Sequence, residues 1–281
     1  MRRRGLWAIF LILASAPAGC GIAPGATLGL GTQSGFQSAS AAQGAVTGPL
    51  ATILSQDRQL AASQQHPIVI FDLDDTLFCT AYRNLEILKE WGATAAGAPY
   101  QAQISALTPE DVSYDITGAL TQMGLSASEE SAVQRFWTAR FFSGAYVGYD
   151  HPEPGAAAYV QAVASSGAEV VYMTGRSSAM ESGTQQALVA DGFPWDPADN
   201  ATQLILKSSK GESDAQFKGA ETQTLEQSGT IVGCFDNEPA NVNMFQQVAP
   251  QATVVFVNTV HSPNAPAVAP GIAQIDSFLA S

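Results

Sequence analysis

The hydrophobic positions of the second half of the chain alternate between two periodicities. Short runs of β-branched and aromatic residues are separated by amphipathic segments with helix-start and helix-stop signals. The pattern predicts strands over 169–173, 203–206, 230–235 and 253–257, with helices over 154–166, 180–190, 214–227 and 239–248. Strands joined by helices of this length form a parallel sheet through right-handed crossovers. We therefore expect an α/β fold with helices on both faces of the sheet.

One further strand precedes this region, at residues 68–71, where four consecutive apolar residues are typical of a strand buried on both faces. Between that strand and Pro154 the periodicity is helical instead. Residues 81–91, for example, carry apolar side chains at helical spacing with charges between them. No strand-like alternation interrupts this part of the sequence. The pattern thus predicts a helical insertion at about residues 79–150.

The N-terminus has the layout of a secretory signal peptide. Three arginines precede an apolar run over residues 6–14, and small residues follow as far as Cys20. Ala18-Gly19-Cys20 resembles the end of a bacterial lipoprotein processing site, in which the cysteine becomes lipidated. Pro17 departs from that pattern, and Ala16-Pro17-Ala18 fits ordinary signal cleavage as the alternative. We predict a signal peptide over 1–20 of the lipoprotein type.

Residues 21–48 consist almost entirely of small and uncharged residues without an apolar period, which predicts a flexible linker. The folded domain is then expected at 49–281. These features predict export across the bacterial inner membrane, to the periplasm or to an outer-membrane anchor. The only expected contact with a membrane is the lipid on Cys20.

Charge limits the classes of partner. The chain of 281 residues has 12 Lys+Arg against 25 Asp+Glu, a formal net charge of -13. Such a surface repels nucleic-acid backbones and anionic lipids, and the sequence has no basic cluster beyond the N-terminus. We expect no nucleic-acid partner.

Three carboxylates, Asp72, Asp74 and Asp75, directly follow the strand at 68–71. Like charges held this close at the end of a buried strand repel one another and lose hydration. A hard cation that accepts oxygen ligands is the simplest compensation. The position also suits a site, because open α/β sheets bind ligands beyond the carboxyl ends of their strands.

The segment Phe71-Asp72-Leu73-Asp74-Asp75-Thr76-Leu77 resembles the first motif of the haloacid dehalogenase-like (HAD) superfamily. The resemblance implies a Rossmann-like, three-layer core with a helical cap inserted after the first strand. It implies Asp72 as the nucleophile and Asp74 as the general acid and base.

Later segments resemble the remaining motifs in order. Met173-Thr174-Gly175-Arg176 ends a predicted strand, and the resemblance makes Thr174 and Gly175 phosphate ligands. A hydroxyl and a glycine at a strand end can also hold phosphate on general grounds. Arg176 either contacts phosphate or pairs with a local acid.

Phosphoryl transfer concentrates negative charge on the carboxylate and the phosphate together, so a nearby ammonium is needed. The candidates are Lys207, Lys210 and Lys218. Lys218 opens the helix before the fourth-motif strand and matches the family layout, so we assign it to catalysis and phosphate binding. Lys207, which follows a strand directly, is the alternative.

The fourth motif, Cys234-Phe235-Asp236-Asn237-Glu238, again ends a strand in an acid. The resemblance implies Mg²⁺ as cofactor, with Asp72, Asp236 and the backbone carbonyl of Asp74 as its protein ligands. Glu238 either contacts metal-bound water or caps the following helix.

The four motifs identify the chain as a member of the HAD superfamily, similar to its secreted and lipoprotein acid phosphatases. The implied function is Mg-dependent hydrolysis of small organic phosphomonoesters through an aspartyl phosphate. The alternatives are a phosphotransferase or phosphomutase, and a non-catalytic surface-binding lipoprotein. Aromatic residues of the insertion are expected to pack its core, and some could form an apolar wall for a substrate ring: Trp91, Phe136, Trp137, Phe141 and Phe142.

Overall fold

The computed structural model describes residues 48–208 and 211–279. The predicted signal peptide, the lipidation site Cys20 and nearly all of the predicted linker lie outside the described residues, and they stay predictions. Within the described part of the chain, no helix combines the length and apolar character needed to cross a membrane.

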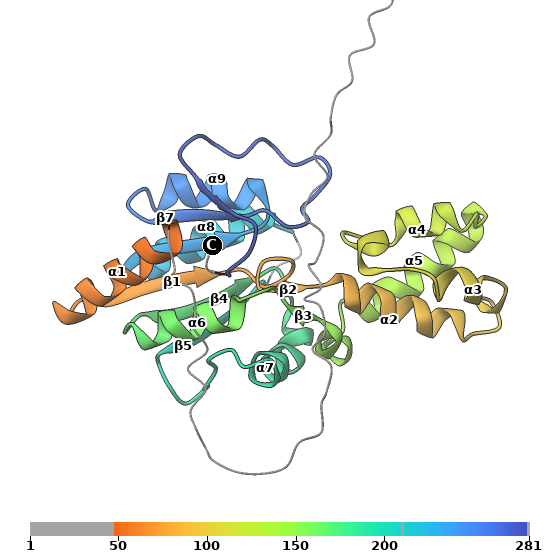
Figure 1. The fold of residues 1–281 in the computed structure, drawn as a ribbon, viewed down its shortest axis with the longest axis horizontal. Coiled ribbons are helices and arrows are strands. Elements are labelled where there is room, and N and C mark those ends of the chain that lie inside the picture. The colour runs from red at the N-terminus through yellow and green to blue at the C-terminus, as the bar shows by residue number, and fades with distance from the viewer. Residues whose placement is uncertain (1–47, 209–210, 280–281) are drawn as a thin grey trace, which may run out of the picture.

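A six-stranded parallel sheet forms the centre of the molecule (Figure 1). Its strand order is β5-β4-β1-β6-β7-β8. The strands are β1 (Pro67–Phe71), β4 (Glu169–Thr174), β5 (Thr202–Leu206), β6 (Thr230–Asp236), β7 (Thr253–Val257) and β8 (Ala273–Ile275). After β1, the chain adds β4 and β5 on one side of β1 and then β6, β7 and β8 on the other side. The predicted α/β class with a Rossmann-like core is confirmed.

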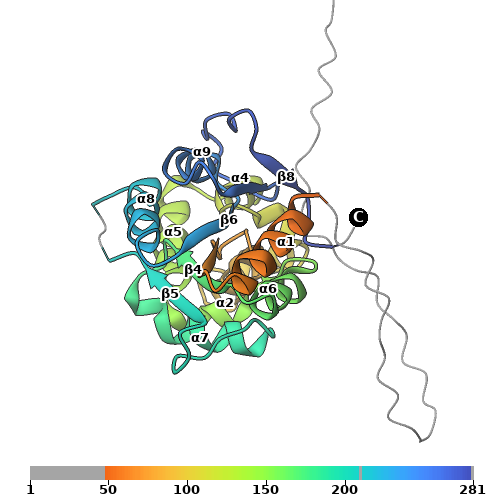
Figure 2. The ribbon, with the colours of Figure 1, turned by 90° about the vertical axis from the view of Figure 1, so that its left-hand side faces the viewer.

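Helices cover both faces of this sheet (Figure 2). One layer contains α1 (Gly48–Ala62), α6 (Ala156–Ser165) and α7 (Glu181–Ala190), and the other contains α8 (Asp214–Leu225) and α9 (Pro239–Val248). Successive residues of β1 point to opposite faces of the sheet, and both faces are apolar, so a helical layer is needed on each face to bury them. Val69 and Phe71 pack into the first layer, whereas Ile68 and Ile70 pack into the second. Burial of both faces accounts for the uninterrupted apolar run in the sequence.

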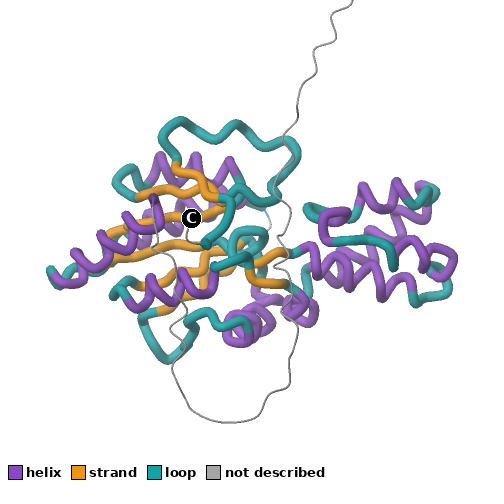
Figure 3. The backbone as a smooth tube through the Cα atoms, viewed as in Figure 1, coloured by secondary structure: helices purple, strands orange, loops and turns teal. Residues whose placement is uncertain are grey.

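The helical residues between β2 (Phe78–Cys79) and β3 (His151–Pro152) form a cap beside the core (Figure 3). It contains α2 (Ala81–Gly92), α3 (Gln101–Ile104), α4 (Thr117–Gln122) and α5 (Ala127–Phe141), with 3₁₀ turns between them. The cap has a hydrophobic cluster of its own, centred on residues such as Leu88, Ile116 and Val133.

Two short antiparallel strands join the cap to the core. β2 (Phe78–Cys79) leads into the cap, β3 (His151–Pro152) leads out, and Phe78 pairs with Pro152. Both crossings therefore lie side by side. The sequence did not indicate this ribbon, because two residues per strand are too few for a periodic pattern.

A buried carboxylate in the first helix makes stability depend on pH. Asp57 of α1 is fully buried; its Oδ2 accepts a hydrogen bond from Ser166 Oγ at 3.2 Å, and its Oδ1 has no hydrogen-bond partner among the described residues. Burial raises the pKa of Asp57 from 3.8 to about 7, against the opposing effects of Ser166 and Arg58. Between these two pKa values the folded chain holds a proton that the unfolded chain releases, so the free energy of unfolding falls as pH rises.

We expect Asp57→Asn to raise the free energy of unfolding at pH 8 by about 1 to 3 kcal/mol, the cost of a buried unsatisfied charge. The gain should nearly vanish at pH 4, where the wild-type carboxyl is protonated. Thermal denaturation at both pH values measures this, with the exposed Glu226→Gln as control. A gain of equal size at both pH values would contradict the assignment.

Candidate active site

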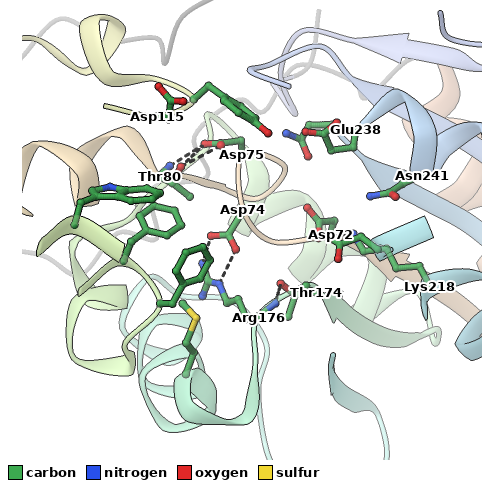
Figure 4. A pocket seen from close by; sticks show the side chains of 18 of the residues that line it. Asp72, Asp74, Asp75, Thr80, Asp115, Thr174, Arg176, Lys218, Glu238 and Asn241 are labelled. Carbon is green, nitrogen blue, oxygen red and sulfur yellow. Dashed lines mark hydrogen bonds and ion pairs between the residues drawn. The ribbon is translucent and has the colours of Figure 1, made fainter. Parts of the chain in front are cut away.

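Three strand ends meet at one edge of the sheet. Asp72 directly follows β1, Thr174 ends β4, and Asp236 ends β6. Because β1 lies between β4 and β6, the three residues lie close together, and Figure 4 shows Asp72 and Thr174 near each other. A cavity of about 390 Å³ is lined by Asp72 and Thr174 and reaches the cap. The sheet order thus brings together residues that lie up to 164 positions apart, from Asp72 to Asp236.

A tight turn holds the first of these residues in place. The backbone N–H of Asp72 donates to the carbonyl of Phe235 at 3.0 Å, which ties the turn to β6. Thr76 Oγ lies 3.1 Å from Asp72 Oδ2 and accepts a hydrogen bond from the Asn237 N–H at 2.9 Å. Asp75 adopts a positive φ of 56° and accepts hydrogen bonds from Thr80, which support the turn, and it also lines the cavity.

Lys218 reaches this edge from α8. Its Nζ lies 2.6 Å from Asp72 Oδ1 and 2.6 Å from Asp236 Oδ2, and the residue is 1% exposed. Burial alone would lower the pKa of Lys218, but the charges of Asp236 and Asp72 outweigh burial and raise it. Lys218 is therefore a charged ammonium shared by two carboxylates.

The alternative lysine lies elsewhere. Lys207 Nζ forms an ion pair with Asp214 Oδ1 at 2.6 Å, and Lys210 is outside the described residues. Asp214 also lies against the glycine of the second motif. A Cβ on Gly175 would lie 2.7 Å from Asp214 Oδ2, so the exposed Asp214 carboxylate would have to shift to admit any other residue.

The two carboxylates beside Lys218 carry more negative charge than one ammonium balances. Burial, and to a lesser extent the charges of Asp236 and Asp74, raise the pKa of Asp72 to about 7 although Lys218 opposes the shift. Asp236 is fully buried and accepts hydrogen bonds from the Glu238 N–H at 2.8 Å and from Asn241 Nδ2 at 3.0 and 3.1 Å.

This donor set fits Mg²⁺. Two carboxylates and a backbone carbonyl are hard oxygen ligands, and Mg²⁺ characteristically keeps several waters beside a few such ligands. Among the described residues, no three His, Cys, Asp or Glu side chains form a metal-binding group. A site on this edge would accordingly combine Asp72, Asp236 and the Asp74 carbonyl with oxygens from outside the chain.

Asp74 occupies a different environment from Asp72. Arg176 holds it with two hydrogen bonds, from Nε to Oδ2 at 3.0 Å and from Nη2 to Oδ1 at 2.8 Å, and Arg83 Nη2 adds a third at 3.0 Å. Burial acts to raise the pKa of Asp74, but the charges of Arg176 and Arg83 outweigh it and hold the pKa well below its usual range. Of the two roles left open for Arg176, the structure shows pairing with an acid.

Thr174 and Glu238 complete the set of residues named from the sequence. Thr174 is fully buried, lines the cavity, and accepts a hydrogen bond from the Arg176 N–H at 3.2 Å. The Glu238 carboxylate accepts hydrogen bonds from the N–H and hydroxyl of Ser262 at 2.8 and 2.6 Å, and it makes no cap hydrogen bond to α9. Capping by the Glu238 side chain is therefore excluded.

The cap provides the opposite wall of the cavity. Trp137, Phe141 and Phe142 line it, and Trp137 is fixed by a hydrogen bond from Nε1 to Asn84 Oδ1 at 2.7 Å. Trp91 is instead buried in the cap core, and Phe136 stacks beneath Arg140 at 3.3 Å. Of the five aromatic residues considered from the sequence, three face the cavity.

Sequence reasoning missed Asn241, Arg83 and Asp150. Asn241 lies in the first turn of α9, where its amide donates to Asp236. Arg83 had a usable signal, since it interrupts the apolar face of an amphipathic helix with a charge. Asp150 had none, because its partners lie 67 and 26 residues away.

Residues 118–250 match a family model described as HAD superfamily, subfamily IIIB (Acid phosphatase). The match includes Thr174, Lys218 and Asp236 and begins after Asp72 and Asp74. No curated protein sequence matches the chain.

Several solved structures are similar to the chain. A HAD-superfamily hydrolase, subfamily IA, variant 1, from Geobacter sulfurreducens is 13% identical over 76% of this chain and 93% of that chain, with a TM-score of 0.45. CbbY from Rhodobacter sphaeroides in complex with phosphate is 13% identical over 76% and 95%, with a TM-score of 0.43. The class C acid phosphatase from Bacillus anthracis is 13% identical over 82% and 81%, with a TM-score of 0.37.

Proposed function

Through the match over residues 118–250 the chain belongs to the HAD superfamily, subfamily IIIB (acid phosphatase), and we propose that it hydrolyses small phosphomonoesters through an aspartyl phosphate on Asp72. One observation carries the proposal. A nearly buried carboxylate lies at the base of a cavity, beside a buried ammonium that is fixed 2.6 Å away. Negative charge that develops on phosphate during transfer would meet that ammonium.

In the first step of this mechanism, Asp72 Oδ attacks phosphorus while the bond from phosphorus to the leaving oxygen breaks. Asp74 gives that oxygen its proton. In the second step, water attacks phosphorus, the bond to Asp72 breaks, and Asp74 takes the water proton. The two arginines keep Asp74 ionised in the observed arrangement, which suits the second step. For the first step, Asp74 must be protonated and must release a guanidinium hydrogen bond so that its O–H reaches the leaving oxygen; the proton that it takes from water in the second step restores this form.

The remaining polar residues bind the phosphoryl group. Thr174 and the turn at Gly175 lie beside Asp72 at the cavity floor, where they would hold phosphate oxygens with Lys218. Mg²⁺ held by Asp72, Asp236 and the Asp74 carbonyl would supply positive charge that offsets the charges of nucleophile and phosphate. Asn241 fixes the Asp236 carboxylate for that task.

A panel of phosphomonoesters assayed with Mg²⁺ and with chelator tests the proposal. Wild type should release phosphate only with the metal, and Asp72→Asn should lose at least ~10³-fold in kcat because it lacks the nucleophile. Circular dichroism checks that the variant folds. Full activity of Asp72→Asn would reject the aspartyl-phosphate mechanism, and transfer of phosphate to an added alcohol instead of water would favour the phosphotransferase alternative.

The two lysines provide a matched pair of variants. We expect Lys218→Ala to lower kcat by at least ~100-fold, the scale for losing one charge partner of the transition state. Lys207→Ala should cost less than about 5-fold, because Lys207 pairs with Asp214 and touches neither Asp72 nor Asp236. Steady-state kinetics of the wild type and both variants on one aryl phosphate measure these two losses in kcat. The reverse ranking would move the catalytic assignment to Lys207.

The leaving-group side of the cavity indicates the kind of substrate. The two cations that line the cavity, Lys218 and Arg176, both lie at its floor and are paired with acids. The cap side and its rim carry aromatic rings together with the half-buried carboxylates of Asp115 and Glu238, which form no ion pairs within the described part of the chain. A second anion on the substrate would be repelled there. The volume of about 390 Å³ also suits a small molecule.

We expect glycerol 3-phosphate to exceed 3-phosphoglycerate in kcat/KM by about tenfold, worth ~1.4 kcal/mol. The two substrates differ in that 3-phosphoglycerate has a carboxylate in place of a hydroxymethyl group of similar size. Asp115→Asn should narrow the gap. Small phosphomonoesters should likewise exceed 3'-phosphorylated DNA by at least ~10-fold. Comparable rates on DNA ends would instead indicate a polynucleotide phosphatase.

A further inference from the structure

Buried charges lie where the cap joins the core. Arg83 is in the first turn of α2, directly after β2, and Asp150 immediately precedes β3. Arg83 is fully buried, and Asp150 is 3% exposed. Because β2 and β3 pair with each other, the two residues meet at the β2–β3 ribbon, which joins the cap to the core and is called the hinge below.

Asp150 orients two arginines at once. Arg83 Nε donates to Asp150 Oδ1 at 2.7 Å, and Arg83 Nη2 donates to Asp150 Oδ2. Arg176 Nη2 donates to the same Oδ2 at 2.8 Å, while its Nη1 lies 3.1 Å from Thr184 Oγ. Both guanidiniums then present an N–H to Asp74 Oδ1, at 3.0 and 2.8 Å. Asp150 is thus joined to Asp74 through two parallel bridges.

Arg83 also contacts the wall of the cavity. Its Nη1 donates to the carbonyl of Phe141 at 3.0 Å, and its guanidinium lies 4.4 Å from the centre of the Phe141 ring. Phe141 lines the cavity from the cap. One fully buried side chain therefore touches Asp74, the hinge and the wall that faces the leaving group.

A purely structural role would not require this arrangement. Burying an ion pair at a hinge gains little over apolar packing, because desolvation offsets most of the attraction. Arg83 and Asp150 form two hydrogen bonds with each other, and Arg83 directs one of its remaining N–H donors to the half-exposed Asp74. Arg83 Nη2 thus donates to Asp74, the residue that transfers the proton in the proposed function.

We propose that Arg83, oriented by Asp150, is a positioning residue that fixes the Asp74 carboxylate relative to the leaving-group side of the cavity. The inference rests on the proposed function of Asp74. It makes the position of the acid depend on the cap, since Arg83 and Phe141 both belong to the cap while Arg176 belongs to the core. Neither Arg83 nor Asp150 need touch the substrate.

The test compares leaving groups. An alkyl alcohol leaves poorly and needs the proton from Asp74, whereas 4-nitrophenolate leaves with little help. Arg83→Lys and Asp150→Asn should each lower kcat on an alkyl phosphate about tenfold more than on 4-nitrophenyl phosphate, and Asp74→Asn should show the same bias more strongly. Arg140→Gln is the matched control, because Arg140 pairs with Glu90 inside the cap. It should leave the ratio unchanged.

Equal losses on both substrates, or no loss, would overturn the proposal, provided that Asp74→Asn itself shows the bias. A wild type that hydrolyses neither substrate would reject the proposed function instead. A crystal structure of Arg83→Lys gives a readout without turnover: the Asp74 side chain should leave the position it holds in wild type. An unmoved Asp74 would overturn the positioning role, and Asp150→Asn serves if Arg83→Lys fails to fold.

Discussion

The buried ammonium of Lys218 is the interaction on which the site depends. It lies between Asp72 and Asp236, two carboxylates that neighbouring strand ends bring together inside a protein core. Without a counter-charge, removal of these groups from water would cost several kcal/mol per ion. α8 must therefore be placed so that residue 218 reaches the sheet edge, and the packing of Phe217 and Leu225 against β4 and β6 does this. The remaining excess of negative charge is what suits the site to Mg²⁺.

Two aspartates separated by one residue are driven in opposite directions by their surroundings. Asp72 faces Asp236 and a single ammonium, and burial raises its pKa to about 7. Asp74 points the other way, toward two guanidiniums, which hold its pKa well below the usual range. Divergent environments for paired carboxylates push their pKa values apart. Here the separation follows from the turn after β1, which directs alternate side chains to opposite sides.

The cap and the core meet at the β2–β3 ribbon and at a cluster of ion pairs beside it. Both chain crossings run through the β2–β3 ribbon, and the cluster of Arg83, Asp150, Arg176 and Asp74 adjoins it, because Arg83 follows β2 and Asp150 precedes β3. A shift of the cap would move the aromatic wall and one partner of Asp74 together. The same insertion lines the cavity through Trp137, Phe141 and Phe142.

The sequence by itself determined the core, the family and the acids at the strand ends. Strands such as 68–71 and 253–257 were predictable because they are buried on both faces, which leaves a continuous apolar run whatever surrounds it. Asp72 and Asp236 followed because a carboxylate after such a run must lie at the sheet edge. Only the tertiary structure decided which lysine lies between them, and that Asp150, Arg83 and Asn241 belong to the site. Those contacts join residues from the cap, from the β2–β3 ribbon and from α9. Local periodicity in the sequence does not predict contacts between distant segments, because these depend on how the helices, the sheet and the cap pack together.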